Sequence, residues 1–142
     1  MKHKSTGTCR CEKVTFSLML PNELEKYKSF TCDCDFCMKR NASYLSHPDG
    51  NLHIESSEPI DIIYQGSKQA AFLTCPSCKV LIAAVYQFND NLKGAFNASL
   101  LKEAGQLKGS IIVSPKHLTP EEKLKNWDKV WLSVAINGND HI

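Results

Sequence analysis

Short segments rich in β-branched and aromatic residues recur along the chain, separated by turn-forming residues. The run from 14 to 20 stops at Pro21, and residues 79–87 form an apolar run typical of a buried strand. Residues 48–51 (PDGN) predict a turn, because Gly and Asn accept a positive φ. Strands are predicted over 13–20, 27–33, 42–46, 51–55, 60–64, 70–75, 79–87, 94–98 and 110–113. This pattern predicts an all-β fold of antiparallel sheets, with a short helix over 99–105.

A second, better-marked helix is predicted near the C-terminal end. Residues 119–122 (TPEE) combine an N-cap Thr, a Pro at the first helical position and a Glu at the third. We expect this helix to run from 120 to about 131, with Leu124, Trp127 and Trp131 on one face. That face either presents the two Trp rings as a stacking platform or packs on the sheet, and packing is the more common arrangement for an amphipathic helix.

Length and composition place the chain among ordinary globular proteins. It has 142 residues, with 42% hydrophobic and 23% charged residues. This length fits one domain over residues 1–142. No apolar run reaches the ~18 residues needed to cross a bilayer. The basic start leads into no apolar stretch of the secretory type, so we expect a cytoplasmic protein without a membrane partner.

Charge gives little support for a nucleic-acid partner. The formal net charge is only +2. If all seven cysteines were thiolates on two Zn²⁺ ions, the folded protein would be nearly neutral. Electrostatic attraction to nucleic acid would then be lost.

The seven cysteines are the strongest compositional signal. Disulfides are disfavoured in a reducing compartment, and an odd number would leave one thiol unpaired. None of the cysteines is isolated in the sequence. They form the clusters Cys9-x-Cys11, Cys32-x-Cys34-x-x-Cys37 and Cys75-x-x-Cys78. Such clusters predict metal ligation, whereas a redox dithiol is expected to precede a helix, and an apolar strand is predicted after Cys78.

Two of these clusters can supply a closed zinc site. Residues i and i+2 of a strand share a face, so Cys9 and Cys11 can reach the same ion. A tight turn at Cys75 and Cys78 can aim two more sulfurs at that ion. Spacing alone leaves another grouping open, in which Cys32 and Cys34 form the four-sulfur site together with Cys75 and Cys78.

The remaining cluster offers only three sulfurs: Cys32, Cys34 and Cys37. A fourth ligand would have to be His47, His53, an aspartate, water or a ligand from outside the chain. An open fourth position is typical of a catalytic zinc.

The cysteine pattern resembles a known family. Its elements are GTCRC at 7–11, Cys32-x-Cys34-x-x-Cys37, and residues 64–67 before Cys75-x-x-Cys78. In this order, over roughly residues 5–100, they resemble the glutathione-dependent formaldehyde-activating enzymes, a domain that centromere protein V also carries.

The resemblance implies a β-tent of antiparallel sheets held by two zinc ions. Cys9, Cys11, Cys75 and Cys78 match the family's structural zinc. Cys32, Cys34 and Cys37 match its second, open zinc, which is associated with activity. The family's reaction joins glutathione to formaldehyde, giving S-(hydroxymethyl)glutathione, and is classed as a carbon–sulfur lyase in reverse. The implied partner is therefore a small thiol such as glutathione.

The sequence departs from the family pattern beside two of the clusters. The family usually has Gly directly after the first pair and after the C-x-x-C, where this chain has Glu12 and Lys79. Glycine at such positions permits a positive φ and a close backbone approach.

The alternative to an enzyme is a non-catalytic zinc module that binds protein or nucleic acid. In that case the second zinc would be structural, closed by a residue such as His47.

Overall fold

The computed structural model describes most of the chain. The described residues are 3–32, 38–39, 42–64, 68–89, 91–113 and 118–138. All structural statements below concern these residues.

Eleven strands form one continuous hydrogen-bonded network. They are β1 (His3–Thr8), β2 (Val14–Leu20), β3 (Lys28–Cys32), β4 (Tyr44–Leu45), β5 (Asn51–Ser56), β6 (Asp61–Tyr64), β7 (Ala71–Thr74), β8 (Leu81–Phe88), β9 (Asn91–Asn97), β10 (Gly109–Val113) and β11 (Leu132–Ile136). Along the main path the order is β1-β2-β5-β11-β9-β4-β3-β10. A branch leaves β9 through β8 and β7 and ends at β6.

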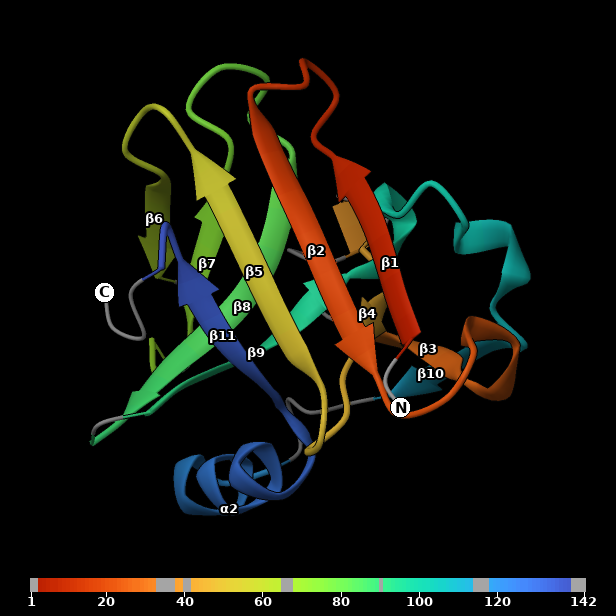
Figure 1. The fold of residues 1–142 in the computed structure, drawn as a ribbon. Coiled ribbons are helices and arrows are strands. Elements are labelled where there is room, and N and C mark those ends of the chain that lie inside the picture. The colour runs from red at the N-terminus through yellow and green to blue at the C-terminus, as the bar shows by residue number, and fades with distance from the viewer. Residues whose placement is uncertain are drawn as a thin grey trace.

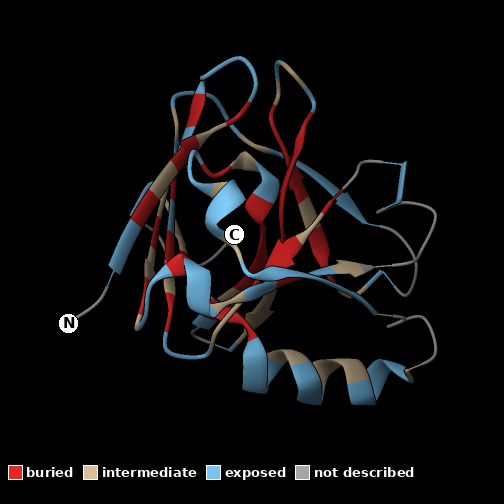
Figure 2. Ribbon diagram, turned by 90° about the vertical axis from the view of Figure 1, so that its right-hand side faces the viewer, coloured by how far each residue is buried: buried red, intermediate tan, exposed pale blue. Residues whose placement is uncertain are grey.

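The network folds into layers that enclose the main core. Figure 1 shows β1, β2, β5 and β11 in front of the β6–β9 branch. In Figure 2 the buried residues gather between these layers. Strand β2 alternates, with Val14, Phe16, Leu18 and Leu20 buried and the residues between them facing outward. Strand β8 is buried over its first five residues, because layers cover both of its faces.

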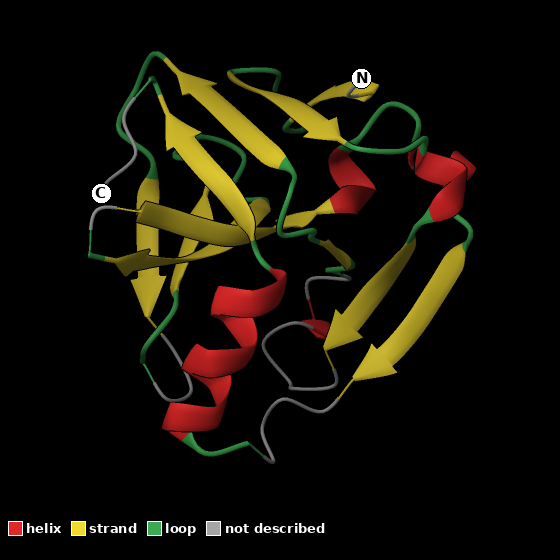
Figure 3. Cartoon of the chain, turned by 60° about the horizontal axis from the view of Figure 1, so that its bottom comes forward, coloured by secondary structure: helices red, strands yellow, loops and turns green. Residues whose placement is uncertain are grey.

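The predicted all-β class with a C-terminal helix is confirmed, and two strand pairings add a detail. Most neighbouring strands are antiparallel, as expected. Strands β10 and β3 pair in parallel, and so do β11 and β5. In Figure 3 the β3–β10 pair appears as two arrows pointing the same way at the side of the molecule. Parallel neighbours require a long crossover, which local sequence patterns do not indicate.

Two strands lie where none was predicted. Strand β1 is the polar segment HKSTGT, and β11 begins two residues after a helix ends. The helix predicted over 99–105 is replaced by two 3₁₀ turns, η2 (Ala98–Leu100) and η3 (Ala104–Gln106). A further 3₁₀ turn, η1, covers Leu24–Lys26.

The capped helix forms as predicted. Helix α2 runs over Pro120–Val130, and its capping box is complete. The Glu122 backbone N–H donates to Thr119 Oγ1 at 3.1 Å, and the Thr119 N–H donates to Glu122 Oε1 at 2.9 Å. Among the described residues, no helix is both long and apolar enough to cross a membrane.

The two tryptophans pack on the sheet. Their rings stack at 4.5 Å, with Trp131 buried directly after the helix and Trp127 6.0 Å from the Tyr86 ring. They therefore belong to a second apolar cluster between α2 and strands β8 and β9.

Candidate metal centre

Two turns bring four cysteines together at one end of the molecule. Cys9 and Cys11 lie in the turn between β1 and β2, which we call the N-terminal turn. Cys75 and Cys78 lie in the turn between β7 and β8, which we call the knuckle. Figure 1 shows both turns at the top of the view. The four sulfurs all lie within 4.8 Å of one another, so the group could hold a metal ion.

The N-terminal turn is closed by backbone hydrogen bonds. The Cys9 N–H donates to the Val14 carbonyl at 3.0 Å, and the Glu12 N–H donates to the Cys9 carbonyl at 3.1 Å. Glu12 adopts a φ of 65° to make this turn. Cys9 and Cys11 therefore converge because the chain turns between them. The sequence-based expectation that they share one face of a strand is wrong, since β1 ends at Thr8.

The knuckle is closed in the same way. The Cys75 N–H donates to the Val80 carbonyl at 3.1 Å, and the Lys79 N–H donates to the Cys75 carbonyl at 3.0 Å. Lys79 has a φ of 64°. Glu12 and Lys79 therefore adopt the positive φ that was expected to favour Gly at these two positions, although both carry a side chain.

Backbone N–H groups point at three of the four sulfurs. Val14 donates to Cys9 Sγ at 3.3 Å. Cys75 Sγ accepts from Ser77 at 3.4 Å and from Cys78 at 3.5 Å. The Val80 N–H lowers the pKa of Cys78 by the same kind of bond. These donors favour thiolates, the form that binds metal.

The pKa values of the cysteines diverge inside the group. Burial raises the pKa of the Cys75 thiol to about 11. Burial acts in the same direction on Cys78, but N–H groups of Val80 and Cys11 outweigh it and bring the pKa of that thiol to about 6. For Cys9 too, burial is outweighed by hydrogen bonds, led by the one from Val14, and the pKa is lowered. Protons in the metal-free group are therefore shared unequally among the sulfurs.

Two polar contacts that the sequence did not predict support the turns. Lys13 Nζ donates to Ser77 Oγ at 3.0 Å and so joins the N-terminal turn to the knuckle. Lys79 forms a 3.0 Å ion pair with Asp61 on β6. All four side chains are exposed, and no motif marked them.

The other predicted ligands are only partly placed. The backbone of Cys32 ends β3, opposite Val113 of β10. Cys34 and Cys37 lie outside the described residues, so the three-cysteine site stays a prediction. His47 Nδ1 accepts the Asp49 N–H at 3.0 Å, and the ring lies edge-on to Tyr27.

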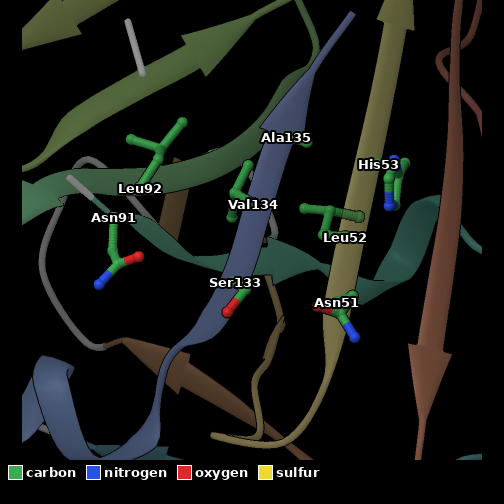
Figure 4. A pocket seen from close by; sticks show the side chains of 8 residues that line it. All are labelled: Asn51, Leu52, His53, Asn91, Leu92, Ser133, Val134 and Ala135. Carbon is green, nitrogen blue, oxygen red and sulfur yellow. The ribbon is translucent and has the colours of Figure 1, made fainter. Parts of the chain in front are cut away.

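His53 lies on the outward face of β5. It borders a hollow of about 180 Å³, shown in Figure 4. The hollow is lined by Asn51, Leu52, His53, Asn91, Leu92, Ser133, Val134 and Ala135, without a cysteine. Nothing in this hollow resembles a metal site, so it adds no ligand to the group described above.

A family model described as "Glutathione-dependent formaldehyde-activating enzyme" matches residues 4–129. No curated protein matches. A crystal structure of a Rhodobacter sphaeroides protein, a Northeast Structural Genomics target, has a TM-score of 0.55 and 21% identity, and covers 75% of this chain and 99% of its own. At that identity the likeness supports the fold alone.

Proposed function

Since the chain belongs to the glutathione-dependent formaldehyde-activating enzyme family, we propose that it is a zinc-dependent protein of the carbon–sulfur lyase type. In this proposal residues 1–142 form one domain with two zinc ions. One ion is structural, and the other binds a small thiol, glutathione, for addition to formaldehyde.

The structural zinc would be held by Cys9, Cys11, Cys75 and Cys78. Four cysteines are a common structural zinc set, with Zn–S bonds of about 2.3 Å. Tetrahedral ligands at that distance are roughly 3.8 Å apart. The Cys11 sulfur lies 3.5 Å from that of Cys9 and 3.6 Å from that of Cys75, so little rearrangement is needed to accept the ion. The gathering of four cysteine sulfurs within 4.8 Å of one another is the single observation that carries the metal proposal.

The reactive zinc would be held by Cys32, Cys34 and Cys37, with one position left open. A free thiol with a pKa of ~8.5 carries little thiolate at neutral pH. A zinc ion at this site would supply the positive charge that holds the substrate thiol as a nucleophilic thiolate. The chain's own part would be to supply these three sulfurs and to leave one position of the ion free for a fourth.

Zinc content and coordination test both parts of the proposal. Protein purified under reducing conditions should hold two zinc ions per chain. X-ray absorption should show the mean sulfur number per zinc rising from about 3.5 to 4 when glutathione is added, because only the open site gains a ligand. Unchanged coordination, with two zinc ions bound, would contradict the thiol site while leaving the structural zinc intact.

A matched pair of variants separates the enzyme from a non-catalytic zinc module. For an enzyme, Cys34→Ser should reduce formation of S-(hydroxymethyl)glutathione to the uncatalysed rate while the protein stays mostly folded. Cys78→Ser should damage folding far more. Equal damage to folding by the two substitutions would mean that both ions are structural, as in a binding module.

A further inference from the structure

Cys11 differs from the other three cysteines of the group in exposure. Cys9 is 2% exposed and Cys75 0%, and Cys78 is partly buried, whereas Cys11 is exposed. A reagent in solution can therefore reach the Cys11 side chain without opening the turn. The buried Cys9 and Cys75 can be reached only after local unfolding, and the partly buried Cys78 is less accessible than Cys11.

Cys11 also differs in its hydrogen bonding. Cys9, Cys75 and Cys78 each have a backbone N–H directed at the sulfur. Within the described part of the chain, which includes the whole of both turns, the polar contacts of Cys11 Sγ are the sulfurs of Cys9, Cys75 and Cys78. The backbone N–H of Cys11 itself is directed at Cys9 and Cys78. The residue thus helps to stabilise its neighbours' thiolates, while its own receives no backbone donor.

This asymmetry has a chemical consequence. A hydrogen bond to a thiolate stabilises its charge and withdraws electron density, which makes the sulfur less nucleophilic. A metal-bound thiolate without such a bond keeps more of its nucleophilicity. Cys11 combines an exposed side chain with a sulfur that no backbone N–H contacts, and the nearby Arg10 and Lys13 are cationic and exposed.

We propose that Cys11 is a modification site, the sulfur at which soft carbon electrophiles attack the metal-loaded four-cysteine group. In this reaction the Cys11 sulfur forms a new bond to carbon, and the leaving group departs with the electron pair of the bond that breaks. The thiolate becomes a neutral thioether, a weaker ligand. Cys9, Cys75 and Cys78 keep their sulfurs, so the group is loosened first on the N-terminal turn.

The inference rests on the proposed structural zinc, so the test begins with the zinc content of the full-length protein. Zinc-loaded protein is then treated with a limiting amount of iodoacetamide, which releases iodide on reaction. After unfolding, the remaining thiols are blocked with isotopically heavy iodoacetamide. Peptide mass spectrometry gives the light fraction at each cysteine. Zinc release is followed in parallel with a chromogenic chelator.

We expect the light label at Cys11 to exceed that at Cys9, Cys75 or Cys78 by about tenfold or more. Unfolded, metal-free protein is the matched control, and there the four should agree within about threefold.

Three results would overturn the inference: uniform labelling of the folded group, first labelling at Cys78, or a Cys11 preference that persists in the unfolded chain. The last would assign the reactivity to local sequence instead of the fold. The zinc content is measured before any labelling. Absence of zinc from the reduced protein would contradict the proposed function itself.

Discussion

The N-terminal turn and the knuckle use the same backbone device in different surroundings. In each, the first cysteine's N–H donates to the carbonyl of the fifth residue beyond it, and the residue after the second cysteine has a positive φ. The knuckle joins strands that each have two neighbours, since β7 lies between β6 and β8, and β8 between β7 and β9. The N-terminal turn is attached to the edge strand β1.

Strand β1 is held mainly by β2. Its second connection is an isolated bridge between Gly7 and Leu101, where a Cβ on residue 7 would overlap the Leu100 carbonyl oxygen. The edge position and few additional backbone bonds make this hairpin the weaker partner. A bound ion would therefore connect a loosely held turn to a firmly held one, so the N-terminal turn would depend more on the metal.

The largest expected effect comes from substituting the buried sulfur of the knuckle. Cys75→Ser removes a metal ligand and leaves a hydroxyl in a fully buried site. We expect the free energy of unfolding to fall by more than about 4 kcal/mol, the range reached when a metal and a buried group are lost together. Chemical denaturation followed by circular dichroism measures this effect.

Cys11→Ser is the matched comparison in the N-terminal turn. Because Cys11 is exposed, the substitution buries no polar group. The free energy of unfolding should therefore fall only by the contribution of the metal ligand, about 2 kcal/mol. A loss at Cys11 as large as that at Cys75 would contradict the proposed difference between the two turns.

Removing the metal should loosen the two turns unequally. With a chelator present, we expect amide hydrogen exchange in β1 and the first residues of β2 to speed up by about tenfold or more. Amides of β7 and β8 should change much less, because neighbouring strands hold both of them. Hydrogen exchange with mass spectrometry can compare the two hairpins in one sample. Equal acceleration in both would mean that the knuckle depends on the ion just as strongly.

Glycine at the two positive-φ positions should stabilise the protein by a smaller amount. A side chain in the left-handed region costs roughly 1–2 kcal/mol, which Glu12→Gly and Lys79→Gly would relieve, partly offset by the greater freedom of Gly in the unfolded chain. We expect a net gain of about 0.5–1 kcal/mol for Glu12→Gly.

The gain for Lys79→Gly should be smaller, because the exposed ion pair with Asp61 is lost. Asp61→Asn is the control for that pair, and thermal melts of the three variants rank the contributions. A loss of stability in Glu12→Gly would contradict the view that the turn is strained.

The smallest effect is expected where the turns meet through side chains. Lys13→Ala and Ser77→Ala each remove an exposed hydrogen bond, so each should change the free energy of unfolding by at most about 0.5 kcal/mol. Because both remove the same contact, the double variant should show no further loss. A double-mutant cycle measures this, and a coupling energy above about 1 kcal/mol would contradict the small contribution expected of this contact.

The sequence predicted local features more successfully than long-range ones. Helix α2 could be predicted because Thr119, Pro120 and Glu122 encode its start within four residues. Strand β1 was missed because its polar segment lies at an edge with little apolar surface to bury. Strand β11 was missed because only Trp131 separates it from the helix, without a turn signal. Its parallel pairing with β5 joins residues some eighty positions apart, which no local pattern shows.

The same distinction applies to the site. Spacing identified Cys9, Cys11, Cys75 and Cys78 as a possible group, and these sulfurs do lie together. Spacing could not show that both pairs lie in turns, nor that one of the four cysteines would be exposed, because exposure depends on how the two hairpins pack.

The most direct test of this account is zinc X-ray absorption on the Cys32→Ser, Cys34→Ser, Cys37→Ser triple variant, in which only the four-cysteine group remains. If the four cysteines form a structural zinc site, this variant should bind one zinc ion per chain, surrounded by four sulfurs at about 2.3 Å. No bound zinc in the folded variant, or a first shell that contains nitrogen or oxygen, would contradict it.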